Sequence, residues 1–227
     1  MRRRATTASS PAYDRSVDET QLRVALVEAG ARLGRRGLIA AGEGNLSVRL
    51  PDDRLLVTPS GRRKDELEPA DLVVAAIDPA GDALPAAGVR PTSDIAIHRA
   101  VLRARPDVNA IVHAHLPAAM ALTVAGERPD PAALPETALF LPRLPFVAFG
   151  APGSDDLARR IAAALADGDP PAGAVLLDRH GAVAVGTGTP EAALAQALDR
   201  IELAEVLCRT WRDALLVRAA RRMVGVD

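Results

Sequence analysis

Aromatic residues and cysteine are both scarce in this sequence. Phe, Trp and Tyr make up 2% of the 227 residues, so few side chains can stack on bases or sugar rings, and we expect a polar ligand to be held by hydrogen bonds. The single cysteine, Cys208, lies among leucines in a helical pattern, and an intrachain disulfide would need a second one. These absences exclude a disulfide-rich secreted scaffold and favour an aliphatic core with Cys208 as an inert thiol.

A charge imbalance and a long apolar segment are also missing. The 28 basic and 29 acidic residues nearly cancel, and no basic run is interleaved with aromatics, which argues against a nucleic-acid partner. No apolar stretch approaches the roughly 18 residues that a membrane span needs. Arg2, Arg3 and Arg4 are not followed by the apolar stretch of a signal peptide. We therefore expect a cytoplasmic protein without a membrane partner, with a disordered tail over residues 1–15 and one domain over residues 16–227.

Apolar periodicity and turn residues predict an alternation of helices and strands. Leu22, Leu26 and Leu33 recur at helical spacing, Ser154 is a candidate helix cap, and Thr189-Pro190 is typical of a helix start. Residues 126–142 are rich in proline and are not assigned. Predicted helices cover residues 17–37, 92–105, 117–124, 154–166 and 189–220, and predicted strands cover 45–50, 55–58, 71–77, 110–115, a segment near 146, 174–177 and 182–185. This order indicates an α/β fold in which helices cover a central mixed sheet.

Three of the four histidines occupy positions suited to a metal ion. His113 and His115 stand at the end of a predicted strand, where alternate side chains point to the same side. His180 follows an apolar strand and precedes Gly181, so it lies where a strand meets a turn and can converge on the same point. Three neutral imidazoles suit Zn²⁺ and leave a position open for substrate or water. The alternative is that the His-x-His pair merely ends a strand.

Asp94 is the candidate acid or base beside this cluster. It stands two residues into the helix predicted to begin near Thr92, where a carboxylate also complements the positive end of a helix. The residue pattern alone leaves both interpretations open. His98, one turn later, is interpreted as a packing or supporting residue.

Three segments are suited to present backbone N–H groups to an anion. Gly42-Glu43-Gly44-Asn45 and Thr58-Pro59-Ser60-Gly61 are glycine-containing turns, and Thr92-Ser93 begins a predicted helix. Together they can cradle a phosphate, although each one alone is equally an ordinary turn or helix start. The basic run that follows the second turn is interpreted as solvated surface rather than as a steering device; it consists of Arg62, Arg63 and Lys64.

Taken together, these motifs resemble the class II aldolase/adducin family, which includes L-fuculose-phosphate aldolase and L-ribulose-5-phosphate 4-epimerase. The resemblance extends from about residue 17 to about residue 215 and rests on six separated motifs that recur in order. They are Gly44-Asn45-Leu46-Ser47, Thr58-Pro59-Ser60-Gly61, Pro91-Thr92-Ser93-Asp94, Arg105-Pro106-Asp107, His113-Ala114-His115 and His180-Gly181.

The resemblance implies a three-layer α/β/α sandwich with a central mixed, largely antiparallel sheet, and a homotetramer with active sites between subunits. It implies Zn²⁺, with Mn²⁺ or Co²⁺ as alternatives, at the positions of His113, His115 and His180, where Asp94 can also ligate the metal. The positions that would hold the phosphate of a small phosphorylated sugar are Gly44, Asn45, Ser60, Gly61, Thr92 and Ser93.

The activity implied is that of a zinc-dependent lyase that cleaves a phosphorylated ketose by retro-aldol chemistry, in which the metal stabilises an enediolate and the carboxylate moves a proton. Two departures bear on this activity. Aldolases of the family usually carry Glu where this chain has Asp94, whereas the epimerase branch carries Asp. The tyrosine that donates a proton in both has no counterpart, because the only tyrosine is Tyr13. A decarboxylase of a phosphorylated 3-oxo sugar acid is therefore the second hypothesis, and a sugar-phosphate 4-epimerase the third.

A non-enzymatic role is the remaining alternative. Adducin-type members of the family keep the fold as cytoskeletal or scaffolding modules without the metal. The three histidines and the carboxylate argue against this role, because a scaffold has no physical reason to keep them together.

Overall fold

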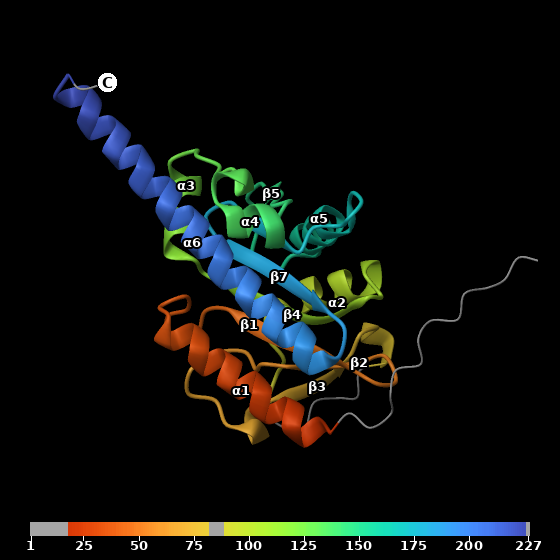
Figure 1. Ribbon diagram of the computed structural model, residues 1–227. Helices are drawn as coiled ribbons and strands as arrows, with labels where there is room; N and C mark the ends of the chain where they lie inside the picture. The colour runs from red at the N-terminus through yellow and green to blue at the C-terminus, as the bar shows by residue number, and fades with distance from the viewer. Residues whose placement is uncertain (1–17, 82–88, 226–227) are drawn as a thin grey trace, which may run out of the picture.

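The computed structural model describes residues 18–81 and 89–225 (Figure 1). The tail predicted over residues 1–15 lies outside the described residues. The principal helices are α1 (Glu19–Arg35), α2 (Ile95–Ala104), α3 (Pro117–Val124), α4 (Pro135–Phe140), α5 (Asp155–Ala166) and α6 (Pro190–Met223). The strands are β1 (Asn45–Leu50), β2 (Arg54–Val57), β3 (Val73–Ala76), β4 (Val108–Ala114), β5 (Phe146–Val147), β6 (Ala174–Leu177) and β7 (Gly181–Thr187).

A seven-stranded sheet forms the centre of the molecule, in the order β3-β2-β1-β4-β7-β6-β5. Every neighbouring pair is antiparallel except β5 and β6, which are parallel. The prediction of a mixed, largely antiparallel sheet is thus confirmed. The register pairs Asn45 of β1 with His113 of β4, and Ala114 of β4 with Ala182 of β7. The start of β1, the end of β4 and the start of β7 therefore meet at one end of the sheet.

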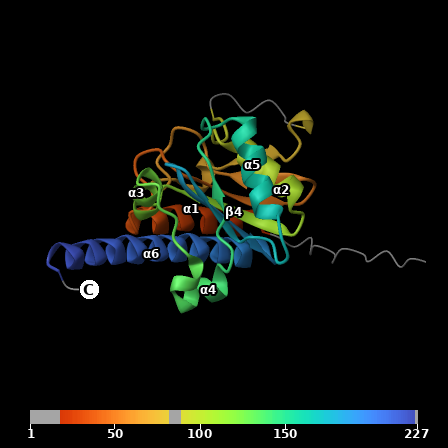
Figure 2. The same ribbon diagram turned by 90° about the horizontal axis from the view of Figure 1, so that it is seen from above.

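Alternation along the strands divides the apolar side chains between two cores. Val112 belongs to the core that α1, α3 and α6 cover, whereas its neighbour Ile111 belongs to the core under α2 and α5. Figure 2 shows α2 and α5 on one side of the sheet and α1 and α6 on the other. By the same alternation, Asn45 and Ser47 point to the side of α2. The fold is the three-layer α/β/α sandwich that the sequence predicts.

Helix caps confirm several predicted starts. The side chain of Ser154 accepts a hydrogen bond from the Leu157 N–H, and that of Thr189 accepts one from the Ala192 N–H at the first turn of α6. The apolar spacing of Leu22, Leu26 and Leu33 is that of α1, in which all three are buried.

Two element boundaries differ from the prediction near the site. The helix α2 begins at Ile95 rather than near Thr92, so Asp94 is its N-cap residue and does not lie two residues inside. The reason is that Thr92 donates its backbone N–H to Thr58 O, which holds this segment in extended form. Strand β4 ends one residue before His115, whose N–H donates to Leu38 O instead of to a strand.

The segment left unassigned by the sequence, residues 126–142, contains a short 3₁₀ helix (Pro131–Ala133) and α4. In both, proline stands in the first turn, where its missing N–H costs nothing.

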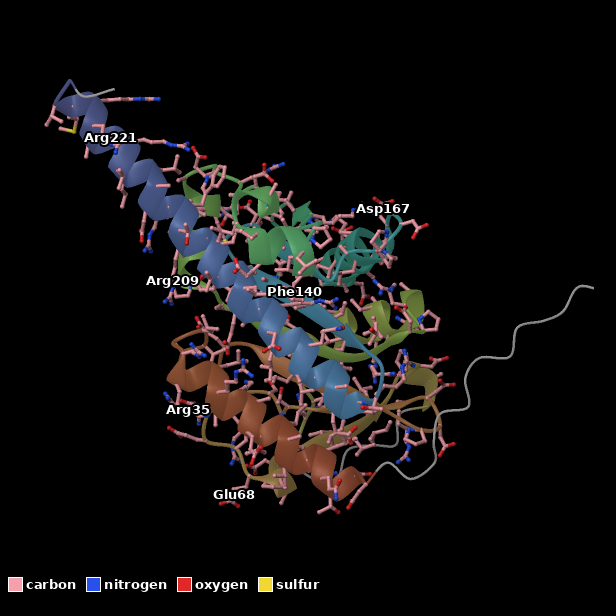
Figure 3. All side chains as sticks on the ribbon, viewed as in Figure 1. Arg35, Glu68, Phe140, Asp167, Arg209 and Arg221 are labelled. Atoms are coloured by element: carbon pink, nitrogen blue, oxygen red, sulfur yellow. The ribbon has the colours of Figure 1, made fainter. Side chains whose placement is uncertain are left out.

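The last turns of α6 extend beyond the rest of the molecule (Figures 1 and 3). Figure 3 places Arg221 on this projecting part, whereas Arg209 lies alongside the body. Apolar side chains on it are exposed, with Leu216 at 62% and Met223 at 88% of their surface. No helix of the part that the structure describes combines the length and the apolar character needed to cross a membrane.

Candidate active site

The three predicted histidines converge at one end of the sheet. His113 is the last but one residue of β4, His115 follows the strand, and His180 lies in the turn between β6 and β7. Their candidate ligand nitrogens all lie within 4.8 Å of one another, and their ring centroids are 4.8 to 5.0 Å apart. The hypothesis that the His-x-His pair only ends a strand does not explain this convergence of a third imidazole from another strand pair.

Two glycines make the convergence possible. Gly181 has φ +84°, and a Cβ atom there would lie 2.1 Å from Ala114 O and 2.8 Å from the His115 Cα. Gly44 has φ +68°, and a Cβ atom there would lie 2.8 Å from His113 O. Any larger residue would push the backbone of the histidine segment away from its neighbours. The glycine beside His180 is thus part of what places His180 next to His115.

Most of the buried polar atoms without partners among the described residues belong to this site. The Nδ1–H of His113 donates to Ala182 O at 2.9 Å, which leaves a lone pair on Nε2. Among the residues that the structure describes, four buried side-chain atoms have no hydrogen-bond partner, and three of them belong to this site: His113 Nε2, His180 Nδ1 and Asp94 Oδ1. Buried polar atoms without partners are costly. Two imidazole nitrogens and a carboxylate oxygen are the ligands that a divalent cation such as Zn²⁺ prefers, so the residues present fit such an ion.

Burial keeps the imidazoles of His113 and His180 neutral at neutral pH. It lowers the pKa of His113 to about 3, with repulsion from His180 and His115 acting in the same direction. The pKa of His180 is also lowered, first by burial and then by His115. A metal ligand must be unprotonated, so at neutral pH His113 and His180 are already in the binding form.

Asp94 lies beside the cluster as a buried carboxylate, 7% exposed. Its Oδ2 accepts a hydrogen bond from Asn45 Nδ2 at 2.9 Å. Burial raises the pKa of Asp94, but attraction to His113 in its protonated form and the hydrogen bond from Asn45 outweigh burial, so the net pKa lies below its ordinary value. Asp94 is therefore ionised at neutral pH, with Oδ1 free of other bonds to the described residues.

Glu43 is a residue of the site that the sequence did not reveal. Its Oε1 lies 3.4 Å from Nδ1 of His115, and its Oε2 accepts a hydrogen bond from the Ala40 N–H at 3.1 Å. A carboxylate at this imidazole nitrogen favours the tautomer whose Nε2 is free for a metal. Glu43 was visible only as a member of a glycine-rich turn, because no pattern in the sequence relates it to His115.

The three segments predicted to hold a phosphate lie next to one another. The turn containing Ser60 is bridged to the segment containing Thr92: Ser60 donates its N–H to Arg90 O at 2.9 Å, and Thr92 donates to Thr58 O at 3.1 Å. These two N–H groups are therefore already bonded. The Ser60 and Ser93 residues are exposed, and the space beside Gly61 is open to 4 Å.

Lys64 links these segments and corrects the prediction of a solvated basic run. It is 2% exposed, and its Nζ donates to Gly42 O and to Arg62 O, each at 2.7 Å. Burial lowers the pKa of Lys64, which attraction to Asp94 partly offsets. Arg62 and Arg63 do lie at the surface, as predicted, where they pair with Asp71 and Asp65. Lys64 differs from the two arginines because its side chain turns inward and bonds to backbone carbonyl groups.

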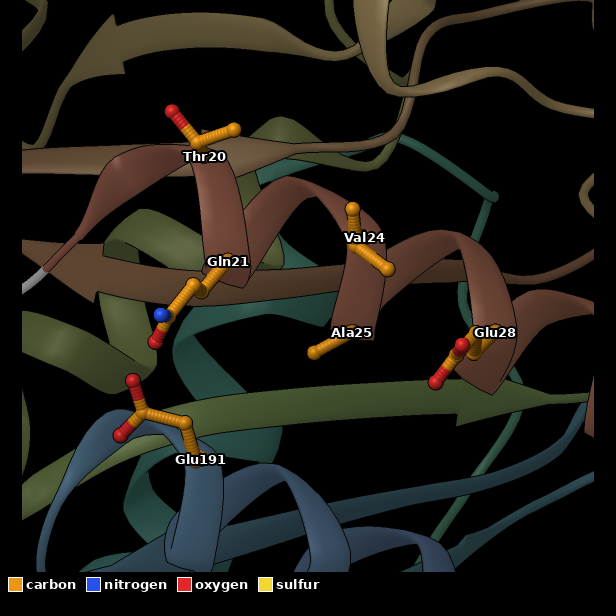
Figure 4. A pocket seen from close by; sticks show the side chains of 6 residues that line it. All are labelled: Thr20, Gln21, Val24, Ala25, Glu28 and Glu191. Carbon is orange, nitrogen blue, oxygen red and sulfur yellow. The ribbon is translucent and has the colours of Figure 1, made fainter.

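A shallow apolar groove elsewhere on the surface is not part of this cluster. Figure 4 shows its lining side chains, which come from α1 and from Glu191 at the start of α6. None of the predicted site residues lines it. Its residues are Thr20, Gln21, Val24, Ala25, Glu28 and Glu191.

Comparison with known proteins establishes the family. Residues 24–212 match the Class II Aldolase and Adducin N-terminal domain, and this chain belongs to that family. It is 31% identical over 199 residues to a 3-oxo-tetronate 4-phosphate decarboxylase from Cupriavidus necator, covering 86% of this chain and 87% of the relative. It is 37% identical over 193 residues to a 5-methylthioribulose-1-phosphate/5-deoxyribulose-1-phosphate aldolase from Rhodospirillum rubrum, covering 84% and 80%. The chain is thus an enzyme of this family rather than a scaffold.

Shorter and structural similarities agree with this assignment. The chain is 38% identical over 107 residues to a methylthioribulose-1-phosphate dehydratase from Granulibacter bethesdensis, and this alignment spans about half of each protein, 47% of this chain and 49% of the relative. Among solved structures, L-fuculose-1-phosphate aldolase from Thermus thermophilus superposes with a TM-score of 0.76 at 31% identity, covering 88% of this chain and 97% of that one. The family resemblance and the fold read from the sequence are both confirmed.

Proposed function

We propose that this protein is a divalent-metal-dependent lyase that cleaves a phosphorylated ketose by retro-aldol chemistry. The observation that carries the proposal is the convergence of three imidazoles. The carboxylate of Asp94, whose buried Oδ1 has no hydrogen-bond partner among the described residues, interacts with two of them, His113 and His180. Similarity to the Rhodospirillum rubrum and Thermus thermophilus aldolases supports the reaction type. The proposed substrate is either a ribulose 1-phosphate derivative, as in the name of the Rhodospirillum rubrum aldolase, or a deoxyhexulose 1-phosphate such as fuculose 1-phosphate.

Each residue of the cluster has a separate role in this proposal. His113, His115 and His180 hold the ion, which we take to be Zn²⁺, with Mn²⁺ or Co²⁺ as alternatives. The ion supplies Lewis-acid stabilisation of the negative charge that develops on the substrate carbonyl oxygen. Asp94 removes the proton from the hydroxyl at the carbon that leaves as the aldehyde. The electrons of the broken C–C bond pass to the fragment that carries the carbonyl group, and Asp94 returns the proton to the carbon of this fragment from which the aldehyde has departed.

The phosphate is proposed to bind at the three adjoining segments. The residues are those expected from the family resemblance: Gly44, Asn45, Ser60, Gly61, Thr92 and Ser93. Two observations support this location. Lys64 brings a buried positive charge between the Gly42 and Arg62 carbonyls, and the hydroxyl-bearing residues Ser60 and Ser93 are exposed on the same linked segments.

The proposal extends to the assembly and the setting of the enzyme. We propose a homotetramer whose active sites lie between subunits, formed by the domain over residues 16–227 and located in the cytoplasm. The exposed apolar side chains on the projecting end of α6, among them Leu216 and Val217, are suited to contact a second subunit.

Decarboxylation of a phosphorylated 3-oxo sugar acid is the second candidate. The Cupriavidus necator decarboxylase is similar over 87% of its length. This reaction also leaves an enolate, which can take its proton from an acid other than tyrosine, so it is compatible with a sequence whose only tyrosine is Tyr13. Dehydration, as in the name of the Granulibacter bethesdensis relative, and 4-epimerisation rank below it.

One assay set distinguishes these reactions. The purified protein is analysed for bound metal and then incubated with 5-methylthioribulose 1-phosphate, fuculose 1-phosphate and 3-oxo-tetronate 4-phosphate. We expect one zinc per chain and release of dihydroxyacetone phosphate from a ketose phosphate, lost in Asp94→Asn. Release of CO₂ from the oxo acid would establish the decarboxylase instead. Loss of water without a three-carbon product would establish a dehydratase, and protein without metal or turnover would refute the proposal.

A further inference from the structure

A chain of hydrogen bonds joins four buried side chains and ends at Asp94. Ser47 Oγ lies 2.7 Å from His98 Nδ1, and His98 Nε2 lies 2.7 Å from Asn45 Oδ1. Asn45 Nδ2 in turn donates to Asp94 Oδ2 at 2.9 Å. Ser47 and His98 are 0% exposed, Asn45 is 2% exposed and Asp94 7% exposed. Water therefore does not compete for these bonds, and each partner has to be satisfied within the chain.

The chemistry of the groups fixes the direction of every bond in this chain. An ionised carboxylate only accepts, so the Asn45 amide has to turn its NH₂ group toward Asp94 and its oxygen toward His98. That oxygen also only accepts, so Nε2 of His98 carries the proton. Nδ1 is then bare and accepts from the Ser47 hydroxyl. A single tautomer of His98 satisfies the whole chain, with donors running from Ser47 to Asp94.

Sheet and helix geometry place the four residues. Asn45 and Ser47 are alternate residues of β1 and point to the side of α2, while Asp94 and His98 lie one helical turn apart at the start of α2. The imidazole of His98 thus bridges Asn45 and Ser47, two residues on the same face of β1. Burial lowers the pKa of His98 to about 4, so it is neutral at pH 7, as the arrangement requires.

We propose that His98 is a positioning residue that locks the Asn45 amide in the orientation that presents NH₂ to Asp94. This inference rests on the proposed role of Asp94 as the proton-transfer group. With Oδ2 held by Asn45, Oδ1 is the oxygen of Asp94 that has no hydrogen-bond partner among the described residues. If the amide turned over, its oxygen would face the carboxylate, and the repulsion would drive Asp94 out of its place or into its protonated form.

The first test reads the tautomer directly and needs no substrate. Long-range ¹H–¹⁵N spectra of the full-length protein at pH 7 distinguish protonated from bare imidazole nitrogens, and the signals of His98 are assigned by their loss in His98→Gln. We expect the neutral Nε2–H form. An Nδ1–H tautomer or an imidazolium at His98 would overturn the inference, whether or not the protein proves to be an aldolase.

The second test uses two variants of similar length. In His98→Gln the new amide can donate to Asn45 and accept from Ser47, whereas in His98→Met it can do neither. We expect kcat of the metal-loaded enzyme to fall about 10- to 100-fold in His98→Met, with KM changed by less than about threefold, and to recover most of the loss in His98→Gln. Thr137→Val is the matched control, because Thr137 lies in α4, outside the site, and its buried hydroxyl donates to Pro131 O.

The outcomes separate the two proposals. If wild-type protein turns over a ketose phosphate and His98→Gln is as impaired as His98→Met, the directional hydrogen bond is not what matters and the inference fails. If the wild type turns over nothing while His98 shows the Nε2–H tautomer, the proposed function fails but the hydrogen-bond chain stands. Equal kcat losses in His98→Met and Thr137→Val would show a general effect of lost stability and would also overturn the inference.

Discussion

Replacing Gly181 by alanine tests whether the close approach of β7 to the histidine segment builds the site. The new Cβ would lie 2.1 Å from Ala114 O, whereas ordinary contact begins near 3.4 Å, so the two backbones have to separate by about 1 Å. The positive φ of +84° adds about 1–2 kcal/mol for a residue with a side chain. Overpacking adds about 1–3 kcal/mol, so we expect Gly181→Ala to lower the free energy of unfolding by about 2–5 kcal/mol.

The function should suffer beyond this loss of stability. A displacement of about 1 Å between His115 and His180 is enough to cost roughly 100-fold in turnover, because the ligands would no longer converge. Gly188→Ala is the matched control: Gly188 has φ +93°, but no atom lies within 4 Å of its added Cβ. Gly188→Ala should lower the free energy of unfolding only by the backbone strain and should leave the affinity for metal unchanged.

Urea unfolding of the metal-free proteins measures the free energy of unfolding, and competition with a chelator measures the affinity for zinc. The reasoning would be refuted if Gly181→Ala and Gly188→Ala lost the same stability and bound zinc equally well.

Three further predictions concern the charged groups of the site. Asp94→Asn should keep its zinc and fold while losing about 100- to 10,000-fold in kcat; unchanged turnover would exclude Asp94 from proton transfer. The pKa values of His98, about 4, and His113, about 3, lie below the unfolded value of 6.5, so the unfolded chain binds more protons between these values. The free energy of unfolding of the metal-free protein should therefore fall as the pH drops from about 6.5 toward 4, by about 1.4 kcal/mol per pH unit for each histidine. Urea titrations that gave the same free energy of unfolding at about pH 6.5 and about pH 5 would contradict this expectation. Lys64→Met should weaken the binding of inorganic phosphate roughly tenfold or more, measured by calorimetry on folded protein, and unaltered affinity would remove Lys64 from the anion site.

The histidine cluster and the fold could be predicted from the sequence because their signals are local. The His113-Ala-His115 spacing follows from the two-residue period of a strand, and the apolar patterns of α1 and α6 mark faces that pack on the sheet. The position of His180 beside a glycine indicated a turn, and the structure shows that this glycine allows the turn to touch β4.

The supporting residues were not accessible, because their partners lie far away along the chain. Lys64 is one of three consecutive basic residues, and nothing in the sequence distinguishes it from the two arginines. Only the folded turn shows that two backbone carbonyl groups accept hydrogen bonds from its ammonium group. His98 was interpreted as a packing or supporting residue, but the sequence could not show that its two nitrogens contact residues of β1. The start of α2 was misplaced because a tertiary hydrogen bond from Thr92 to Thr58 overrides the local preference for helix.

The sheet order has a consequence for the assembly of the molecule. His113 and His180 come together only when β4 pairs with β7, a contact such as Val112 with Ala184 between segments that are distant in sequence. Contacts of this kind form slowly, because a long loop has to close first. The imidazole cluster therefore cannot template the early stages of folding. A nascent chain gains its third imidazole only once residue 180 has been synthesised and β7 has paired with β4. Binding of a metal would therefore show that the centre of the sheet has formed.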